Sequence, residues 1–481
     1  MGKPRLPNQK KAYKELSKRL AGYMMRVRNI YDRLNEKAAM LVESVGYDGL
    51  TEFSFDDYPE IERDVKLLLS QFVGELQTLI YSGTSSEWKS SNTFQDAVAD
   101  KALKYYRAQV YGDRFKHYYR DNGDQLKAFL HRKENGLNLS SKLWNQSGNY
   151  KESLEVTIST AIEKGMSATA LSKKLSRYLN DWPSLQADYQ EKYGKATNIH
   201  DCEYRSLRLA RNEISMAYRS AEQARWQQFD FILGYKIKLS DSHPRYDICD
   251  DLTGDYPKDF KFRGWHPNCL CYTVPIVMSE DEYWSDNREN SPNKITAPPK
   301  NFGEWVDKSE NLERIGKANG KGTLPYWLRD NAKIKDCSVL MSKARTYGDA
   351  IQKQAETIAE KYNGIATPIN YKGFSSMYRK LNSEKDMLVS DIKDSVRNTI
   401  VVEKENIGSV VKELQSLSTF NRYKSQTPEK FCGYSGNIIN LKMPNGIQAE
   451  IQVNTPKMIY AKETEANARK ILGNKVWEKI A

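Results

Sequence analysis

Two different spacings of apolar residues divide this chain of 481 residues. Through most of the first 229 residues, apolar side chains recur every three or four positions, which places them on one face of an α-helix. After that point they alternate every second position, which is typical of β-strands with one buried face. The helical spacing predicts helices over 10–45, Tyr58–Gly83, Tyr105–Leu130, Ser153–Leu179 and Tyr204–Phe229. We therefore expect a mostly helical N-terminal two-thirds.

The first alternating stretches flank a loop-rich region that contains histidine and cysteine. "GYKIKLSDSHP" (Gly234–Pro244) and "CYTVPIVM" (Cys271–Met278) each predict a strand. The following segment, 279–335, is rich in Asn, Lys, Pro and Gly, which predicts a linker or an irregular connection. A new amphipathic helix is expected to begin near Ser342.

Strand patterns return in the C-terminal part, over 398–403, 436–444 and 447–455. The last two flank Pro444-Asn445-Gly446, where the Asn-Gly pair predicts a hairpin turn. The fold class that follows is a multidomain α+β protein. It comprises a helical, basic region over 1–145, a domain with a small β-containing part over 146–285, a linker over 286–340 and an α/β domain with a mixed or antiparallel sheet over 341–481.

The net charge of +12 is concentrated at the N-terminus. Residues 1–30 hold nine Lys and Arg against one acid, Glu15. Such a stretch suits the phosphate backbone of DNA, and it equally suits the solvated face of a helix. The sequence has no apolar run long enough to cross a membrane and no secretory h-region. Its six cysteines are too few for a disulfide scaffold, which fits a reducing compartment.

The stretch "GWHPNCLCY" (Gly264–Tyr272), together with "DSHPRYDICDDLTG" upstream, concentrates soft metal ligands in two loops. The candidates are His243, Cys249, His266, Cys269 and Cys271. Four such ligands satisfy tetrahedral zinc, although the spacing lacks the common pair of Cys-x-x-Cys motifs. Buried or free thiols are the alternative reading. The absence of Cys-x-x-Cys from this segment disfavours a redox site.

This arrangement resembles the phage head-morphogenesis domain of Mu F-like and SPP1-type minor head proteins. The resemblance covers roughly residues 150–280 and is carried by "ARNEISMAYRSAEQARW", the Cys-Asp loop and "HPNCLCY", with Tyr246 where a first cysteine would fall. It implies a protein that associates with the phage portal and other head proteins during head assembly or DNA delivery. The implied location is the bacterial host cytoplasm and the virion head.

Three C-terminal stretches suggest phosphate chemistry. In "NYKGFSSMYRKL", Lys372, Ser376 and Lys380 recur every four residues and share one face of a helix and its lead-in, with Arg379 beside them. Cations and a hydroxyl on one face suit a triphosphate, and a solvated basic helix gives the same pattern.

The other two stretches place carboxylates at strands. "DIKDSVRNTIVV" offers Asp391 or Asp394 at the start of a strand, followed by Arg397. In the last strand, Gln448, Glu450 and Gln452 share one face, which suits either a Mg²⁺ site or a plain polar outer face.

Together these stretches resemble the RelA/SpoT-type alarmone synthetases, whose fold is nucleotidyltransferase-like, over roughly residues 345–470. Asn370 and Ile438 stand where the family usually has arginine and histidine, so the acceptor stays open. The resemblance implies that Asp394 (or Asp391) and Glu450 bind Mg²⁺, that Tyr434 stacks on the acceptor base and that Gln452 supports the site. The remaining implied nucleotide-binding residues are Lys372, Ser376, Arg379, Lys380 and Arg397.

The sequence thus predicts a phage or prophage minor head protein that carries a RelA/SpoT-like domain. That domain would transfer pyrophosphate from ATP to a nucleotide or RNA, and without a hydrolase domain it would act as a toxin. The alternative is a structural virion protein or DNA-binding adaptor in which the nucleotidyltransferase domain is an inactive relic.

Overall fold

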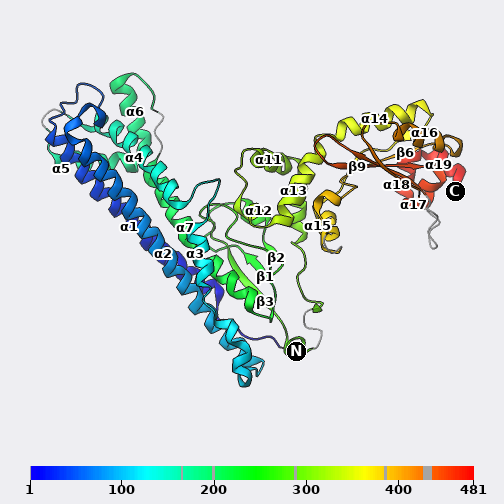
Figure 1. The fold of residues 1–481 in the computed structure, drawn as a ribbon, viewed down its shortest axis with the longest axis horizontal. Helices are drawn as coiled ribbons and strands as arrows, with labels where there is room; N and C mark the ends of the chain where they lie inside the picture. The colour runs from blue at the N-terminus through cyan, green and yellow to red at the C-terminus, as the bar shows by residue number, and fades with distance from the viewer. Residues whose placement is uncertain (1, 164–165, 198–200, 286–289, 384–386, 426–435) are drawn as a thin grey trace. The chain divides into compact units, whose positions relative to one another are not determined.

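The computed structural model describes residues 2–481 except 164–165, 198–200, 286–289, 384–386 and 426–435. The chain forms two compact units, Met1–Ile295 and Thr296–Ala481, which we call unit 1 and unit 2 and describe separately (Figure 1). No helix in the described ranges is long and apolar enough to span a lipid bilayer.

Three long helices form the body of unit 1 (Figure 1): α1 (Gln9–Ser44), α2 (Glu62–Tyr105) and α7 (Cys202–Gln228). Shorter helices pack at one end of this body, namely α4 (Leu139–Ala161), α5 (Ala168–Asn180) and α6 (Trp182–Tyr193). The rings of Tyr31, Phe72 and Tyr150 meet in the core, with centroids 4.8–5.5 Å apart. The predicted helical N-terminal part is confirmed, but the one helix predicted over Ser153–Leu179 is wrong, because α4 ends at Ala161 and α5 begins at Ala168.

The predicted end of the second helix at Gly83 is wrong, because α2 continues to Tyr105. Gly83 does not end the helix; it allows neighbouring helices to pack closely against α2. A Cβ atom at this position would lie 2.7 Å from Ile214 Cδ1 of α7 and 3.1 Å from Tyr23 Cε1 of α1. The missing side chain therefore lets three helices approach closely.

The single helix predicted over Tyr105–Leu130 is also wrong. A 3₁₀ segment covers Gln109–Tyr119, and a separate helix, α3, covers Gly123–His131. Arg107 and Asn122 adopt left-handed backbone conformations, with φ of 55° and 56°, which a continuous helix does not allow.

A small antiparallel sheet completes unit 1, in the order β2-β1-β3. Its strands are β1 (Ile232–Lys238), β2 (Gly254–Tyr256) and β3 (Tyr272–Val277), so both predicted strands are confirmed. Ile237 pairs with Gly254 on one side and with Thr273 on the other. The loop that leaves β1 and the loop that enters β3 therefore lie at the same end of the strands.

Unit 2 begins with helices where an irregular segment was expected. They are α10 (Lys300–Asp307), α11 (Ser309–Gly320), α12 (Tyr326–Arg329) and α13 (Ala332–Arg345), followed by α14 (Gly348–Lys361) in place of one helix starting near Ser342. The ring of Phe302 packs 5.7 Å from that of Trp327 and 5.3 Å from that of Phe374. A few large aromatic residues thus bury a segment that is polar on average.

The sheet of unit 2 is mixed, with the order β4-β6-β9-β8-β7 and with β5 also paired to β6. The strands are β4 (Ile365–Ala366), β5 (Asn370–Tyr371), β6 (Val396–Val401), β7 (Phe420–Ser425), β8 (Asn437–Lys442) and β9 (Gln448–Asn454). β6 and β9 run parallel, whereas β8 and β9 form the predicted antiparallel hairpin. Gly446 in its turn has a φ of 84°, which suits glycine.

One face of this sheet is apolar and buried. Ala449, Ile451 and Val453 of β9 lie fully buried on one face, next to Val396 and Ile400 of β6. Helices α14 and α16 (Ile407–Gln415) pack on the sheet, while α17 (Pro456–Lys462), α18 (Glu465–Leu472) and α19 (Asn474–Ile480) pack together around Val401 (Figure 1).

Candidate nucleotide site and His/Cys cluster

A row of polar side chains crosses the second face of the unit 2 sheet. The strand register places Arg397 beside Glu450, and Glu450 beside Asn440. Glu450 is only 9% exposed and Gln452 only 6%. A plain solvated outer face would leave these side chains exposed, so their burial favours a functional role over that alternative.

Asp394 is the centre of a cluster of cations. Its Oδ2 lies 2.6 Å from Lys372 Nζ and 3.0 Å from Arg397 Nη2, and its Oδ1 lies 3.6 Å from Lys380 Nζ. Burial of the carboxyl raises its pKa, but the hydrogen bond and charge of Lys372, with the charges of Lys380 and Arg397, lower the pKa below the ordinary value overall. Asp394 is therefore ionised near neutral pH.

The structure separates the two aspartates that the sequence left as alternatives. Asp391 is exposed in a 3₁₀ turn, where its Oδ2 accepts a hydrogen bond from the Leu388 amide at 2.9 Å. Asp394 is buried among cations three residues later. Of the two, Asp394 lies in the candidate site.

Arg397 joins the two buried carboxylates. Its Nη2 contacts Asp394, and its Nε lies 3.2 Å from Glu450 Oε1. Gln452 Nε2 donates to Glu450 Oε1 at 2.7 Å, and Lys462 Nζ donates to Gln452 Oε1 at 2.7 Å. Lys462 belongs to α17, and sequence reasoning missed it because only the turn after β9 brings this helix back over the sheet.

The helix α15 (Phe374–Ser383) supplies Lys380 but not every residue expected of it. The carboxylate of Asp307, in α10, accepts a hydrogen bond from the Phe374 amide at 2.8 Å and so fixes the start of α15. Ser376 and Arg379 are exposed on this helix. Tyr434, predicted to stack on the acceptor base, lies outside the described residues.

A cavity of about 560 Å³ adjoins the cluster. Arg397 lines it together with Asn370, Thr399, Lys462 and Lys470. Its size falls in the range that holds small ligands, and its three cations outnumber its one acid, Glu463, which suits an anionic ligand. This cavity and the adjoining Asp394–Glu450 cluster form the candidate nucleotide site.

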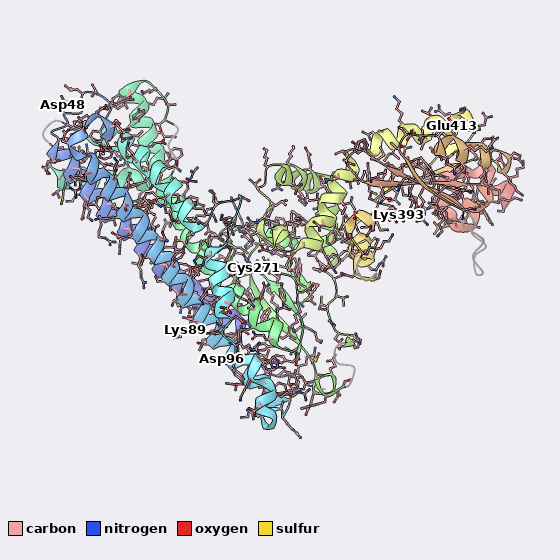
Figure 2. The ribbon with its side chains drawn as sticks, in the orientation of Figure 1. Asp48, Lys89, Asp96, Cys271, Lys393 and Glu413 are labelled. Atoms are coloured by element: carbon pink, nitrogen blue, oxygen red, sulfur yellow. The ribbon has the colours of Figure 1, made fainter. Side chains whose placement is uncertain are left out.

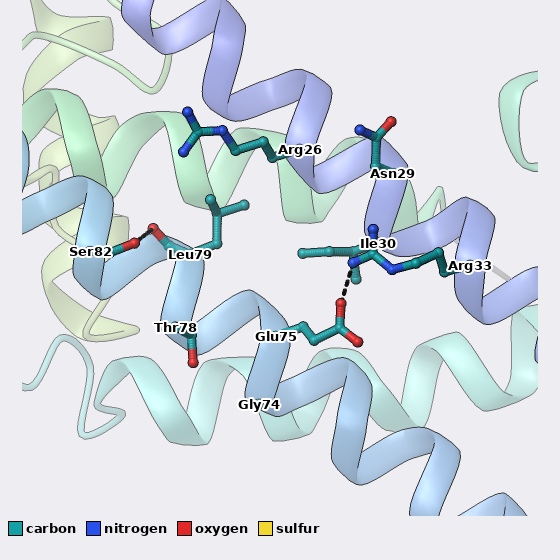
Figure 3. A pocket seen from close by; sticks show the side chains of 9 residues that line it. All are labelled: Arg26, Asn29, Ile30, Arg33, Gly74, Glu75, Thr78, Leu79 and Ser82. Atoms are coloured by element: carbon teal, nitrogen blue, oxygen red, sulfur yellow. Dashed lines mark hydrogen bonds and ion pairs between the residues drawn. The ribbon is translucent and has the colours of Figure 1, made fainter.

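A second cavity lies between α1 and α2 of unit 1 and has a volume of about 450 Å³ (Figure 3). Its acid, Glu75, is ion-paired with Arg33, and Ser82 Oγ donates to the Leu79 carbonyl. The guanidinium of Arg26 lies 5.3 Å from the ring centroid of Tyr23. The one carboxylate that lines this cavity is therefore already paired with a cation of the opposite helix.

The basic N-terminal stretch forms α1, which packs against α2, α5 and α7. Four of its cations are ion-paired: Lys10 with Asp241, Lys18 with Glu15, Arg19 with Glu87, and Arg28 with Glu203. These pairs offset part of the local positive charge. DNA contact by this segment stays a prediction.

The His/Cys candidates of unit 1 converge at one edge of the small sheet, at the position of Cys271 in Figure 2. The thiols of Cys249, Cys269 and Cys271 lie within 4.8 Å of one another, and His266 Nε2 lies 3.1 Å from Cys249 Sγ. His243, the fifth candidate, lies within 4.8 Å of Cys249 Sγ and of a carboxylate oxygen of Asp247, and its Nε2 is 2.9 Å from Asp250 Oδ2.

The known proteins to which this chain is similar are synthetases of modified nucleotides. No family model matches the sequence. A stretch of 143 residues is 34% identical to the (p)ppApp synthetase toxin Tas1 of Pseudomonas aeruginosa (strain UCBPP-PA14). This similarity covers 28% of the chain and 32% of Tas1, so the chain spans about a third of the length of that relative.

Two solved structures are also similar. One is the complex between the type VI effector Tas1 and its immunity protein, with 33% identity, a TM-score of 0.27 and coverage of 30% of this chain and 75% of that chain. The other is the small alarmone synthetase 1 of Bacillus subtilis bound to pppGpp, with 16% identity, a TM-score of 0.22 and coverage of 32% and 90%.

None of these matches bears on the resemblance to phage head-morphogenesis proteins, which stays a prediction. The sequence similarity to Tas1 agrees with the motifs that resemble the alarmone synthetases. It supports a nucleotidyltransferase domain in this chain.

Proposed function

We propose that unit 2 transfers a pyrophosphoryl group from ATP to an adenine nucleotide. The observation that carries this proposal is the cluster in which Arg397 joins Asp394 and Glu450 while Lys372 and Lys380 face Asp394. The similarity to Tas1, named as a (p)ppApp synthetase toxin, supports an adenine acceptor over a guanine one.

The chemistry requires an acceptor hydroxyl to attack the β-phosphorus of ATP. A new oxygen–phosphorus bond forms, the bond between the β-phosphorus and the oxygen that bridges to the α-phosphate breaks, and AMP leaves. Negative charge accumulates on the transferred group, and Lys372, Lys380 and Arg397 are placed to offset it.

The acidic residues of the site fit a magnesium ion. Asp394 Oδ1 accepts no hydrogen bond within the described part of the chain, and Arg397 already places a positive charge between Asp394 and Glu450. Mg²⁺, when bound by Asp394 and Glu450, would neutralise phosphate oxygens of ATP. Arg397 would then be free to contact the phosphates.

The direct test incubates the full chain and Mg²⁺ with ATP labelled at the γ-phosphate and, in separate reactions, AMP, ADP, GDP, GTP or tRNA. ATP alone serves as both donor and acceptor in one further reaction. We expect label in adenosine products that carry an additional pyrophosphate. Label in guanosine products or tRNA only would overturn the adenine acceptor, and no labelled product with any acceptor would overturn the transferase itself.

Lys462 is expected to contribute to binding of the donor. Replacing Lys462 with methionine removes a cation from the cavity wall and should raise KM for ATP roughly tenfold, as the loss of one charged contact does. The matched control is Lys457→Met in the same helix, where the side chain is exposed. Steady-state kinetics of both variants check this, and equal KM values would contradict a role for Lys462.

The same proposal makes this unit toxic to a cell that cannot remove its product. A role of unit 1 in phage head assembly rests on its sequence motifs alone and remains a prediction. The two roles are compatible, since unit 1 and unit 2 are separate compact units.

A further inference from the structure

Three thiols and one imidazole from two separate loops meet in unit 1. Cys249 lies in α8 (Ile248–Asp251), in the connection from β1 to β2, whereas His266, Cys269 and Cys271 lie in the connection from β2 to β3. The three cysteines are buried. Because the first loop leaves β1 at the end of the sheet where the second loop enters β3, the strand pairing itself brings these side chains together.

The separation of two of the thiols matches that of ligands around one tetrahedral ion. Ligands bonded at about 2.3 Å to a tetrahedral centre lie about 3.8 Å from one another. The Sγ atoms of Cys249 and Cys269 are 3.7 Å apart, and His266 Nε2 is 3.1 Å from Cys249 Sγ. A disulfide would hold two sulfur atoms at about 2.0 Å, and all three cysteines are free.

The imidazole of His266 is oriented as a ligand. Its Nδ1 lies 2.7 Å from the carbonyl oxygen of Pro267, which can only accept a hydrogen bond. Nδ1 therefore donates this hydrogen bond, and Nε2 is the ring nitrogen that faces the Cys249 thiol, as the ligand atom of a metal-binding histidine would. Asp247 Oδ2 also lies 3.2 Å from Nε2 and is the competing partner of the ring.

The surroundings offset the charge that such a site would carry. Zn²⁺ with three thiolates and a neutral imidazole has a net charge of −1, which burial would penalise. The guanidinium of Arg219 is buried beside the site, with Nη2 donating to the carbonyls of Cys269 and Cys271 at 2.8 Å each. Its charge offsets that of the site.

We propose that Cys249, His266, Cys269 and Cys271 bind one Zn²⁺, which cross-links the two loops of the small sheet. Three cysteines and one histidine are an established ligand set for structural zinc. The ion would join the β1–β2 loop to the β2–β3 loop. Because Arg219 of α7 also donates to the β2–β3 loop, the ion would link both loops to the helices of unit 1. This inference does not depend on the proposed function of unit 2.

Metal analysis of the full chain, purified without chelators, tests the proposal. We expect one zinc per chain, and less than about a fifth of that in Cys269→Ser, since a structural site needs all four ligands. The matched controls are Cys202→Ser and Cys337→Ser, which alter buried cysteines elsewhere and should keep one zinc. Zinc near zero in the wild-type chain, or full zinc in Cys269→Ser, would overturn the proposal.

A second measurement covers the case in which Cys269→Ser fails to fold. The wild-type chain is stripped of metal with a chelator and titrated with Co²⁺. We expect an intense visible spectrum of tetrahedral thiolate coordination that saturates at one equivalent and disappears when Zn²⁺ is added. No such spectrum from a refolded chain would equally overturn the site.

Discussion

Asp394→Asn is expected to reduce pyrophosphate transfer by roughly a thousandfold, while Asp391→Asn should leave the rate within about twofold of wild type. The two residues lie three positions apart in the same stretch of sequence, "DIKDSVRNTIVV". Asp394 faces Lys372, Lys380 and Arg397, and its Oδ1 is available to a metal ion. Asp391 only accepts a hydrogen bond from the Leu388 amide.

The substitution removes a charge and preserves shape. Asparagine can still accept a hydrogen bond from Lys372, but it cannot neutralise three cations or bind Mg²⁺ firmly. The cations around it are partly exposed, so water can solvate them and the unit should still fold. The loss is therefore expected in kcat rather than in expression or secondary structure.

The measurement is the rate of labelled product formation at saturating ATP, with circular dichroism and thermal unfolding of each variant as folding checks. A folded Asp394→Asn chain with near wild-type rate would contradict the assigned site. If Asp391→Asn were the inactive variant, the metal site would instead lie at the 3₁₀ turn.

The sequence predicted β1, β3, β6, β8 and β9, because alternation and the Asn-Gly turn are local signals. It missed β2, β4, β5 and β7, the first three of which have only two or three residues. It also placed Gln448, Glu450 and Gln452 on one face, since the period of a strand is two. It could not tell whether that face was solvated. Burial depends on α17 and on the neighbouring strands, which the alternation of β9 does not encode.

The errors arose where one residue or one contact outweighs the local pattern. Gly83 looks like a helix end, yet it permits close contact with Ile214, 131 positions later in the chain. The 286–340 segment looks like a linker, but Phe302 and Trp327 within it pack against each other and against Phe374. Such contacts join residues far apart in sequence, so composition averaged over a window hides them.

The fold also decides which of the predicted site residues reach the Asp394 cluster. Lys372, Ser376 and Lys380 share a spacing of four, but only the two lysines reach Asp394, because α15 begins at Phe374 and turns Ser376 toward solvent. Lys462 belongs to no motif and enters the site through the fold alone.

Arg219→Met is expected to destabilise unit 1 by on the order of 3–5 kcal/mol. This buried guanidinium donates to three backbone carbonyls: that of Arg263 at 2.9 Å, and those of Cys269 and Cys271 at 2.8 Å each. Methionine fills much of the same volume but donates nothing. Two buried carbonyls and one partly buried carbonyl would lose a charged donor. Glu222, whose pKa burial raises to about 7, would lose a nearby cation.

Thermal unfolding of the full chain should show the transition of unit 1 lowered by roughly 10 °C. Arg208→Met is the matched control, because Arg208 lies on the exposed side of the same helix and should shift the transition by no more than about 2 °C. Hydrogen exchange at residues 263–272 localises the effect, since loss of Arg219 frees this loop. The loop is held twice, by Arg219 from α7 and by the proposed zinc ion from the β1–β2 connection. Unchanged protection in Arg219→Met would therefore mean that the proposed zinc ion alone holds the loop. It would contradict the stabilisation assigned to this arginine.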